Sequence, residues 1–143
     1  MKALFGLLLA LVLSIPGGEA LAQITDLNSA INKAGRQRML SQRMAKFYQA
    51  IGWGVGDNAS AGELEKARKE FIAAHEELKK AAGESGPLKE SLERVGRQWI
   101  FFDAALAQRG GDRRYFATDV AAASELILQE METAVGLFEK LPK

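Results

Sequence analysis

The chain has 143 residues, with 19 basic and 18 acidic side chains and a formal net charge of +1. This balance gives no reason to expect nucleic acid as a partner or a general attraction to anionic membranes. The sequence has one histidine and no cysteine, which excludes disulfides, a c-type haem and zinc or di-iron sites with their ordinary ligands. We therefore expect no metal and no cofactor.

The first 22 residues have the features of a secretory signal peptide. Lys2 precedes an apolar run over residues 3–15, and Ala20 and Ala22 supply the small side chains that signal peptidase prefers. We expect cleavage after Ala22 and a periplasmic or secreted product. The run of roughly 13 residues is short for a membrane span. An uncleaved anchor is the alternative.

The remaining residues, 23–143, predict a single domain built only from helices. Apolar residues recur at intervals of three and four, and no segment alternates with period two for long enough to predict a strand. Four amphipathic helices joined by short loops predict an antiparallel up-down-up-down four-helix bundle. The segments are Thr25 to Ile51, then from after Ser60 to Ala81, Leu88 to Leu106, and Phe116 to Leu141.

The first of these segments carries an arginine where an aliphatic residue is expected. Its apolar seam passes through Ala34, Arg38, Ser41 and Ala45. Burying an unpaired guanidinium is costly. The seam therefore predicts either an ion pair inside the bundle, with an acid such as Asp103, or an arginine that waits for an anionic ligand. The residues alone leave both open.

A small polar patch surrounds this arginine in the expected helix. Gly35 lies three residues before Arg38, on roughly the same side, and Ser41 or Gln42 follows it one turn later. A guanidinium donates two parallel hydrogen bonds, which suits planar oxyanions. The same region holds further basic residues that could flank the patch: Lys33, Arg36, Arg43 and Lys46.

The same segment also predicts a homodimer. A second apolar stripe, formed by Leu40, Met44, Phe47 and Ile51, is available to meet a partner while the first faces the bundle. If two such helices pack about a two-fold axis, each Arg38 meets its twin, and an anion between them removes the repulsion. Ligand binding would then be coupled to dimer geometry.

Catalytic chemistry has little support in this sequence. There is no cysteine nucleophile, nucleophile elbow, phosphate-binding loop or dinucleotide fingerprint. We therefore expect no enzymatic activity. His75 lies on a helix rich in charged side chains, so we expect it to be solvated. Most aromatic residues of the last two helices are expected in the core.

Residues 31–44 carry a family resemblance. Ile31-Asn32-x-Ala34-Gly35-Arg36-Gln37-Arg38-Met39-Leu40-Ser41-Gln42-Arg43-Met44 resembles the signature of PilJ-type domains, the N-terminal sensor domains of type IV pilus methyl-accepting chemotaxis transducers. The Gly-x-x-Arg-Met-x-Ser-x-Arg pattern is also similar to the P-box of the nitrate/nitrite sensor kinases NarX and NarQ. The resemblance implies an extracytoplasmic four-helix bundle over the mature chain.

The resemblance also implies roles for four motif residues, and Ser41 of the polar patch completes the predicted ligand site. In the nitrate sensors the P-box arginine binds the anion at the dimer interface near the motif glycine, and by motif position these are Arg38 and Gly35. Lys33 stands where the kinase P-box has a basic residue, Arg43 is the second motif arginine, and Ser41 lies between them. Arg36 and Gln37 follow the PilJ-type pattern instead, which departs from the nitrate sensors.

The sequence therefore predicts a stand-alone sensor module that binds a small, nitrate- or nitrite-like oxyanion at a dimer interface formed by helix one. The alternative is a structural or interaction module of a type IV pilus or chemotaxis system, with no small ligand. A membrane receptor or a pilus component would then be its partner.

Overall fold

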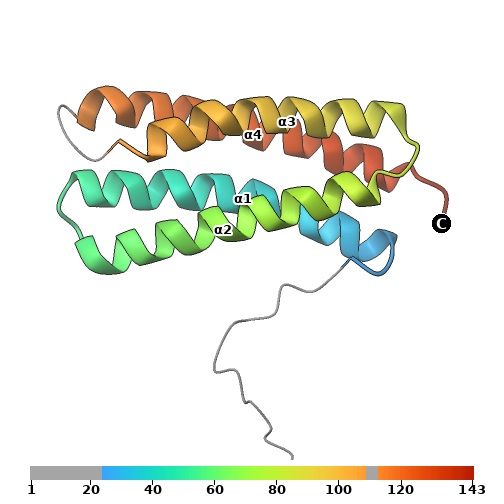
Figure 1. Ribbon diagram of the computed structural model, residues 1–143, viewed down its shortest axis with the longest axis horizontal. Coiled ribbons are helices and arrows are strands. Elements are labelled where there is room, and N and C mark those ends of the chain that lie inside the picture. Colours follow the sequence, from blue (N-terminus) through green and yellow to red (C-terminus); the bar gives the residue numbers. More distant parts are fainter. Residues whose placement is uncertain (1–23, 109–112) are drawn as a thin grey trace, which may run out of the picture.

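The computed structural model describes residues 24–108 and 113–143, so the predicted signal peptide lies outside the described residues. These residues form four helices and no strand, which confirms the all-α prediction. Their bounds are α1 Leu27–Gly52, α2 Asp57–Ala81, α3 Gly86–Leu106 and α4 Arg113–Glu139. Figure 1 shows them lying along the long axis of the molecule, with consecutive helices running in opposite directions.

Local signals in the sequence set the beginnings of the helices. Asp26 is the N-cap of α1: its carboxylate accepts from the Ser29 amide at 2.7 Å, and the Ser29 hydroxyl oxygen accepts from the Asp26 amide at 3.1 Å. This capping box satisfies amides that the first turn leaves unpaired. Ser85 caps α3 in a similar way, with Pro87 in its first turn.

Helix α2 begins four residues earlier than the sequence predicted, at Asp57. The preceding Gly56 has φ of +61°, a left-handed conformation that glycine adopts without strain. Ser60, which we expected to precede the helix, lies in its first turn and donates its hydroxyl to the Val55 carbonyl at 3.1 Å. The serine therefore closes the loop and does not begin the helix.

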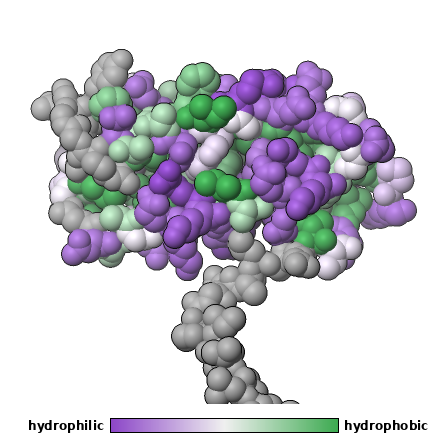
Figure 2. Space-filling view, in the orientation of Figure 1, coloured by the Kyte–Doolittle hydropathy of each residue, from purple (hydrophilic) through white to green (hydrophobic). Residues whose placement is uncertain are grey.

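The apolar cores of α2, α3 and α4 follow the predicted spacing of three and four residues. Fully buried members include Leu64, Phe71 and Leu78 from α2, Leu92, Val95 and Phe102 from α3, and Val120, Ile127, Met131 and Phe138 from α4. The face seen in Figure 2 is mostly polar, with separate apolar patches. Within the described residues, no helix combines the length and apolar content that crossing a bilayer requires.

Helix α1 differs from the predicted seam. Its buried positions run through Ala34, Gln37, Ser41 and Met44, so Gln37 occupies the place we assigned to Arg38. Both choices alternate intervals of three and four, and periodicity alone does not separate them. The prediction that Arg38 lies in the middle of the seam is therefore wrong.

The second apolar stripe of α1 is not a free surface in the structure. Leu40 and Met44 are buried in the core of their own bundle, and Phe47 and Ile51 pack partly against it. A homodimer through helix one would have to use the more polar face that carries Met39, Gln42 and Lys46.

The helices are not equally close. Helix α1 packs against α2 and α4, and α3 packs against α4, whereas the α2 and α3 backbones approach each other much less. Aromatic side chains fill the α2–α3 interface: the Phe71 and Trp99 rings stack with centroids 4.5 Å apart, and Trp99 meets Phe102 edge-on. Such ring pairs stabilise wide helix interfaces because each buries a large apolar area.

Candidate functional site

The predicted site residues lie in the middle of α1, and two of them meet. The Arg38 guanidinium folds back over Gly35, where Nη2 is 3.7 Å from the position that a Cβ on Gly35 would take. That distance is an ordinary contact, so an alanine at position 35 would touch the guanidinium without a clash. Arg38 is partly exposed, at 38 % of its side-chain surface, on the edge of α1 that faces α4.

The charge of Arg38 is weakly compensated within the described part of the chain. Its one ion pair joins Nη1 to Oε1 of Glu132 on α4 at 3.7 Å, and both side chains are exposed. This separation exceeds the length of a hydrogen bond. Asp103, which we considered as an internal partner, instead binds Arg68: Arg68 Nε donates to Oδ1 at 2.8 Å. The prediction of an Arg38–Asp103 pair is therefore wrong.

The other basic residues of the motif point to α2. Lys33 pairs with Glu77, Arg36 with Glu70 and Arg43 with Glu63. Partner numbers fall along α2 as they rise along α1, as antiparallel helices require. Lys33 is the most buried cation of this ladder, with 10 % of its side chain exposed. Lys33 and Arg43 thus have carboxylate partners in the chain and do not converge on Arg38.

Ser41 faces away from the predicted patch. The residue is fully buried, and its hydroxyl donates to the Arg38 backbone carbonyl at 2.8 Å. Gln42 remains exposed, and its Nε2 donates to the Ser124 carbonyl of α4 at 3.4 Å. Of the five predicted ligand residues, the structure therefore brings together only Gly35 and Arg38.

Gln37 is a polar residue of α1 whose burial the predicted seam did not include. The side chain is fully buried, and Nε2 donates to the Phe71 carbonyl of α2 at 3.0 Å, whereas Oε1 has no hydrogen-bond partner among the described residues. An orphaned buried amide oxygen costs free energy. A register passing through Ala34, Gln37 and Ser41 would have identified it.

His75 is buried, not solvated as we expected. The residue is 9 % exposed, its ring stacks near Phe71, and Nδ1 has no hydrogen-bond partner in the described part of the chain. Gly96 of α3 makes room for it, because a Cβ there would lie 3.4 Å from Nε2. Burial lowers the pKa of His75, and the nearby Lys79 lowers it further, while Glu76 acts in the opposite direction. Burial therefore favours the neutral ring in the folded state.

A shallow depression of about 530 Å³ lies on α1 close to Arg38, lined by Met39, Gln42, Arg43, Lys46 and Phe47. The cationic groups of Arg43 and Lys46 lie 5.4 and 5.5 Å from the Phe47 ring centroid. This face is basic because α1 contains no acidic residue. Across the described residues, no group of three or more histidine, aspartate or glutamate side chains is arranged to hold a metal ion.

Comparison with known proteins gives one match. No curated protein and no solved structure shows significant similarity to the chain. The family model described as "Type IV pili methyl-accepting chemotaxis transducer N-term" matches residues 20–112, more than half of the 143 residues. Domains of this family are usually periplasmic sensory regions. The chain therefore belongs to the PilJ family and is a sensory module of the chemotaxis-transducer type.

Proposed function

We propose that this domain is a periplasmic or secreted sensor, folded as an up-down-up-down bundle, that binds a small oxyanion such as nitrate or nitrite through Arg38 beside Gly35. The supporting observation is the contrast within the motif. Arg36 and Arg43 each have a close carboxylate partner on α2. Among the described residues Arg38 pairs only with Glu132, at 3.7 Å, and it remains partly exposed.

The chemistry of this arrangement suits a planar anion. A guanidinium presents paired N–H donors in one plane, which match two oxygens of nitrate or of a carboxylate. The absence of a side chain at Gly35 leaves the helix surface beside the guanidinium open on that side. Glu132 competes for the same donors, so an incoming anion would displace a weak ion pair and not a strong one.

We further propose that two copies associate through the exposed face of α1. The functional analogue would be the dimer interface of NarX and NarQ that contains their P-box. The exposed face of α1 carries Arg38 and Lys46. Two copies of such a face repel each other, and a bound anion lowers that repulsion. Anion binding would thereby shift the monomer–dimer equilibrium or the dimer geometry, which is how a ligand produces a signal.

The alternative, an interaction module without a small ligand, has one observation in its favour. Lys33, Arg36 and Arg43 all serve the packing of α1 on α2. In that case the motif specifies the bundle, and partners bind elsewhere on the surface.

Thermal unfolding of the protein beginning at Gln23 tests the proposal. Nitrate, nitrite and small carboxylates are compared with chloride at equal ionic strength. Binding to the native state stabilises it by about 2.7 kcal/mol when the ligand is at 100 times its Kd. We expect a concentration-dependent rise in Tm for at least one anion, lost in Arg38→Ala. Glu132→Gln should bind the same anion more tightly, since it removes the competing carboxylate.

Arg97→Ala is the matched control, because Arg97 is an exposed arginine on α3 with no ion pair among the described residues. This variant should keep the full response. Sedimentation velocity with and without the active anion tests the dimer. An unchanged Tm with every anion, combined with a lower Tm for Arg38→Ala alone, would show that the arginine only supports the fold.

A further inference from the structure

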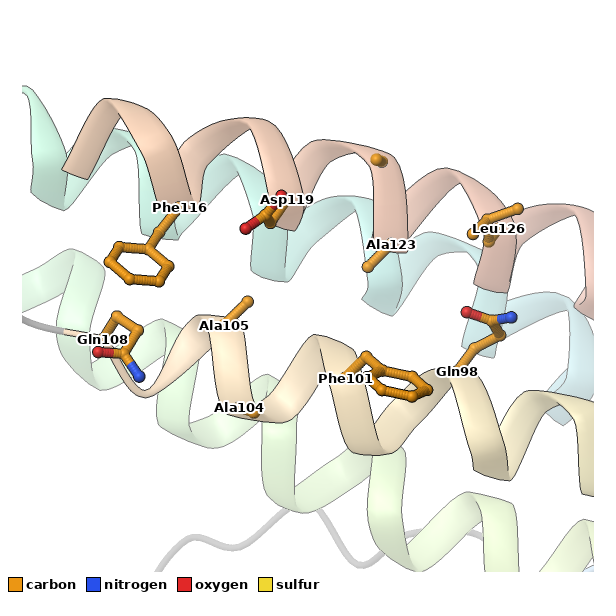
Figure 3. A pocket seen from close by; sticks show the side chains of 10 residues that line it. Gln98, Phe101, Ala104, Ala105, Gln108, Phe116, Asp119, Ala123 and Leu126 are labelled. Carbon is orange, nitrogen blue, oxygen red and sulfur yellow. The ribbon is translucent and has the colours of Figure 1, made fainter. Parts of the chain in front are cut away.

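A shallow groove between α3 and α4 lies away from the predicted anion site. It has a volume of about 420 Å³. Figure 3 shows Phe116 and Asp119 of α4 and Gln108 of α3 near one end, and Gln98 of α3 and Leu126 of α4 near the other. Small side chains occupy the length between them: Ala104 and Ala105 from α3, and Ala122 and Ala123 from α4.

The groove exposes large apolar side chains that the core does not use. Phe101 is 70 % exposed and Leu126 is 46 % exposed, whereas the adjacent Phe102 and Ile127 are fully buried. The core is therefore complete without Phe101 and Leu126. Exposed apolar side chains gathered around a concave surface are typical of sites where another protein binds.

The charged residues inside the groove-lining segments are acidic, whereas Arg97, exposed on α3 just before Gln98, flanks the groove. Residues 98–108 and 116–126 contain no lysine or arginine, and their acids are Asp103, Asp119 and Glu125. Asp103 is bound by Arg68. Asp119 and Glu125 are exposed and form no ion pair within the described residues, although Glu125 accepts a hydrogen bond from Gln129 Nε2 at 3.3 Å. The α4 rim thus carries two exposed acids, and no cation among the described residues pairs with them.

We propose that the α3–α4 groove binds an amphipathic helix of another protein, with an apolar stripe and a row of lysine or arginine residues. The apolar stripe would lie on the alanine floor between Phe101 and Leu126, because small side chains let a third helix approach two packed helices. The basic row would face Asp119 and Glu125.

This inference does not depend on the oxyanion proposal, because no groove residue belongs to the Arg38 site. Its test uses the protein beginning at Gln23, in which all four helices are retained. The probe is a fluorescent 18-residue leucine–lysine peptide with an amphipathic helical pattern. A leucine–glutamate peptide of the same pattern tests charge, and a serine–lysine peptide tests the apolar stripe. Anisotropy gives the affinity, and amide chemical shifts locate the site.

We expect the leucine–lysine peptide to bind and to shift amides of residues 98–108 and 116–126. Phe101→Ser should weaken binding by about tenfold or more, as removal of a central apolar contact does. Ile100→Ser is the matched control: Ile100 is 65 % exposed but does not line the groove, so its affinity should stay within about twofold. Asp119→Asn with Glu125→Gln should weaken binding and reduce its dependence on salt.

Other results would overturn the proposal. One is a leucine–glutamate or serine–lysine peptide that binds with the same affinity as the leucine–lysine peptide. Another is a set of amide shifts confined to α1 and α2. A third is an equal loss of peptide affinity in the Phe101→Ser and Ile100→Ser variants. Self-association that Phe101→Ser abolishes would identify a second copy as the occupant. Phe101-dependent binding to anionic phosphatidylglycerol vesicles, without peptide binding, would identify a lipid surface. Because Phe101 is exposed, Phe101→Ser should keep the parent Tm, which verifies that the variant folds.

Discussion

The two helix pairs of the bundle use their charges differently. Between α1 and α2, three basic residues of α1 pair with three acids of α2: Lys33–Glu77, Arg36–Glu70 and Arg43–Glu63. Between α3 and α4, Arg94 bonds to Glu130, but the half near the groove is packed by alanines and leaves Asp119 and Glu125 without ion pairs in the described residues. The basic side chains that pair α1 with α2 are thus unavailable to ligands, whereas the two acids of α4 are accessible to partners.

The largest expected effect concerns the core that both pairs share. Met131 of α4 is fully buried, and Met131→Ala should lower the free energy of unfolding by about 2–5 kcal/mol, because it leaves a cavity. Met39→Ala on α1 is the control, since Met39 is 43 % exposed and should change stability by about 0.5 kcal/mol or less. Urea unfolding measures both. Equal losses would contradict the assignment of the core.

The next largest effect compares the contributions of two ion pairs of α1 to stability. Glu77→Gln leaves Lys33 without its carboxylate in a mostly buried position, and we expect a loss of about 1–3 kcal/mol in the free energy of unfolding. Glu132→Gln removes the distant, exposed partner of Arg38 and should cost about 0.5 kcal/mol or less. Urea unfolding of both variants compares the two sides of α1. A larger loss of unfolding free energy for Glu132→Gln than for Glu77→Gln would contradict this prediction.

Gln37 tests whether a buried polar group strengthens the α1–α2 pair. Gln37→Met removes one hydrogen bond to the Phe71 carbonyl and also removes the orphaned Oε1. The lost bond costs about 1 kcal/mol and the removed orphan returns a similar amount, so the net change should be near zero or stabilising. Thermal and urea unfolding measure it. A loss as large as that of Glu77→Gln would mean that Oε1 has a partner in solution.

The smallest expected effect is a dependence of stability on pH through His75. Its pKa is lowered in the folded state by burial, so the unfolded chain binds more protons as the pH falls through the ordinary value near 6.5. The contribution of His75 is complete above that value and is lost as the pH falls toward the lower folded pKa. Urea unfolding between pH 5 and 8 should show this slope, and His75→Leu should flatten it. An unchanged slope in the variant would assign the dependence to other groups.

Much of the bundle could be read from single residues in the sequence. The Asp26 cap, the apolar positions of α2, α3 and α4 and the four-helix count follow from capping and from the helical repeat, which are local properties. The start of α2 could not be predicted in this way. Gly56 and Ser60 both favour turns, and the helix begins directly after Gly56. The motif itself identified Gly35 and Arg38 as neighbours, since their spacing is set within one helix.

The sequence by itself therefore determined the helices, most of the core and the composition of the basic motif. Tertiary structure decided which motif residues remain available. Whether Gln37 or Arg38 faces the core depends on a rotation of α1 that only its packing against the other helices fixes. Likewise, the partners of Lys33 and Arg43 are acids of α2 that lie 44 and 20 residues further along the chain, and the α3–α4 groove exists only where two helices meet. Periodicity describes one helix at a time, whereas burial and ion pairing depend on its neighbours.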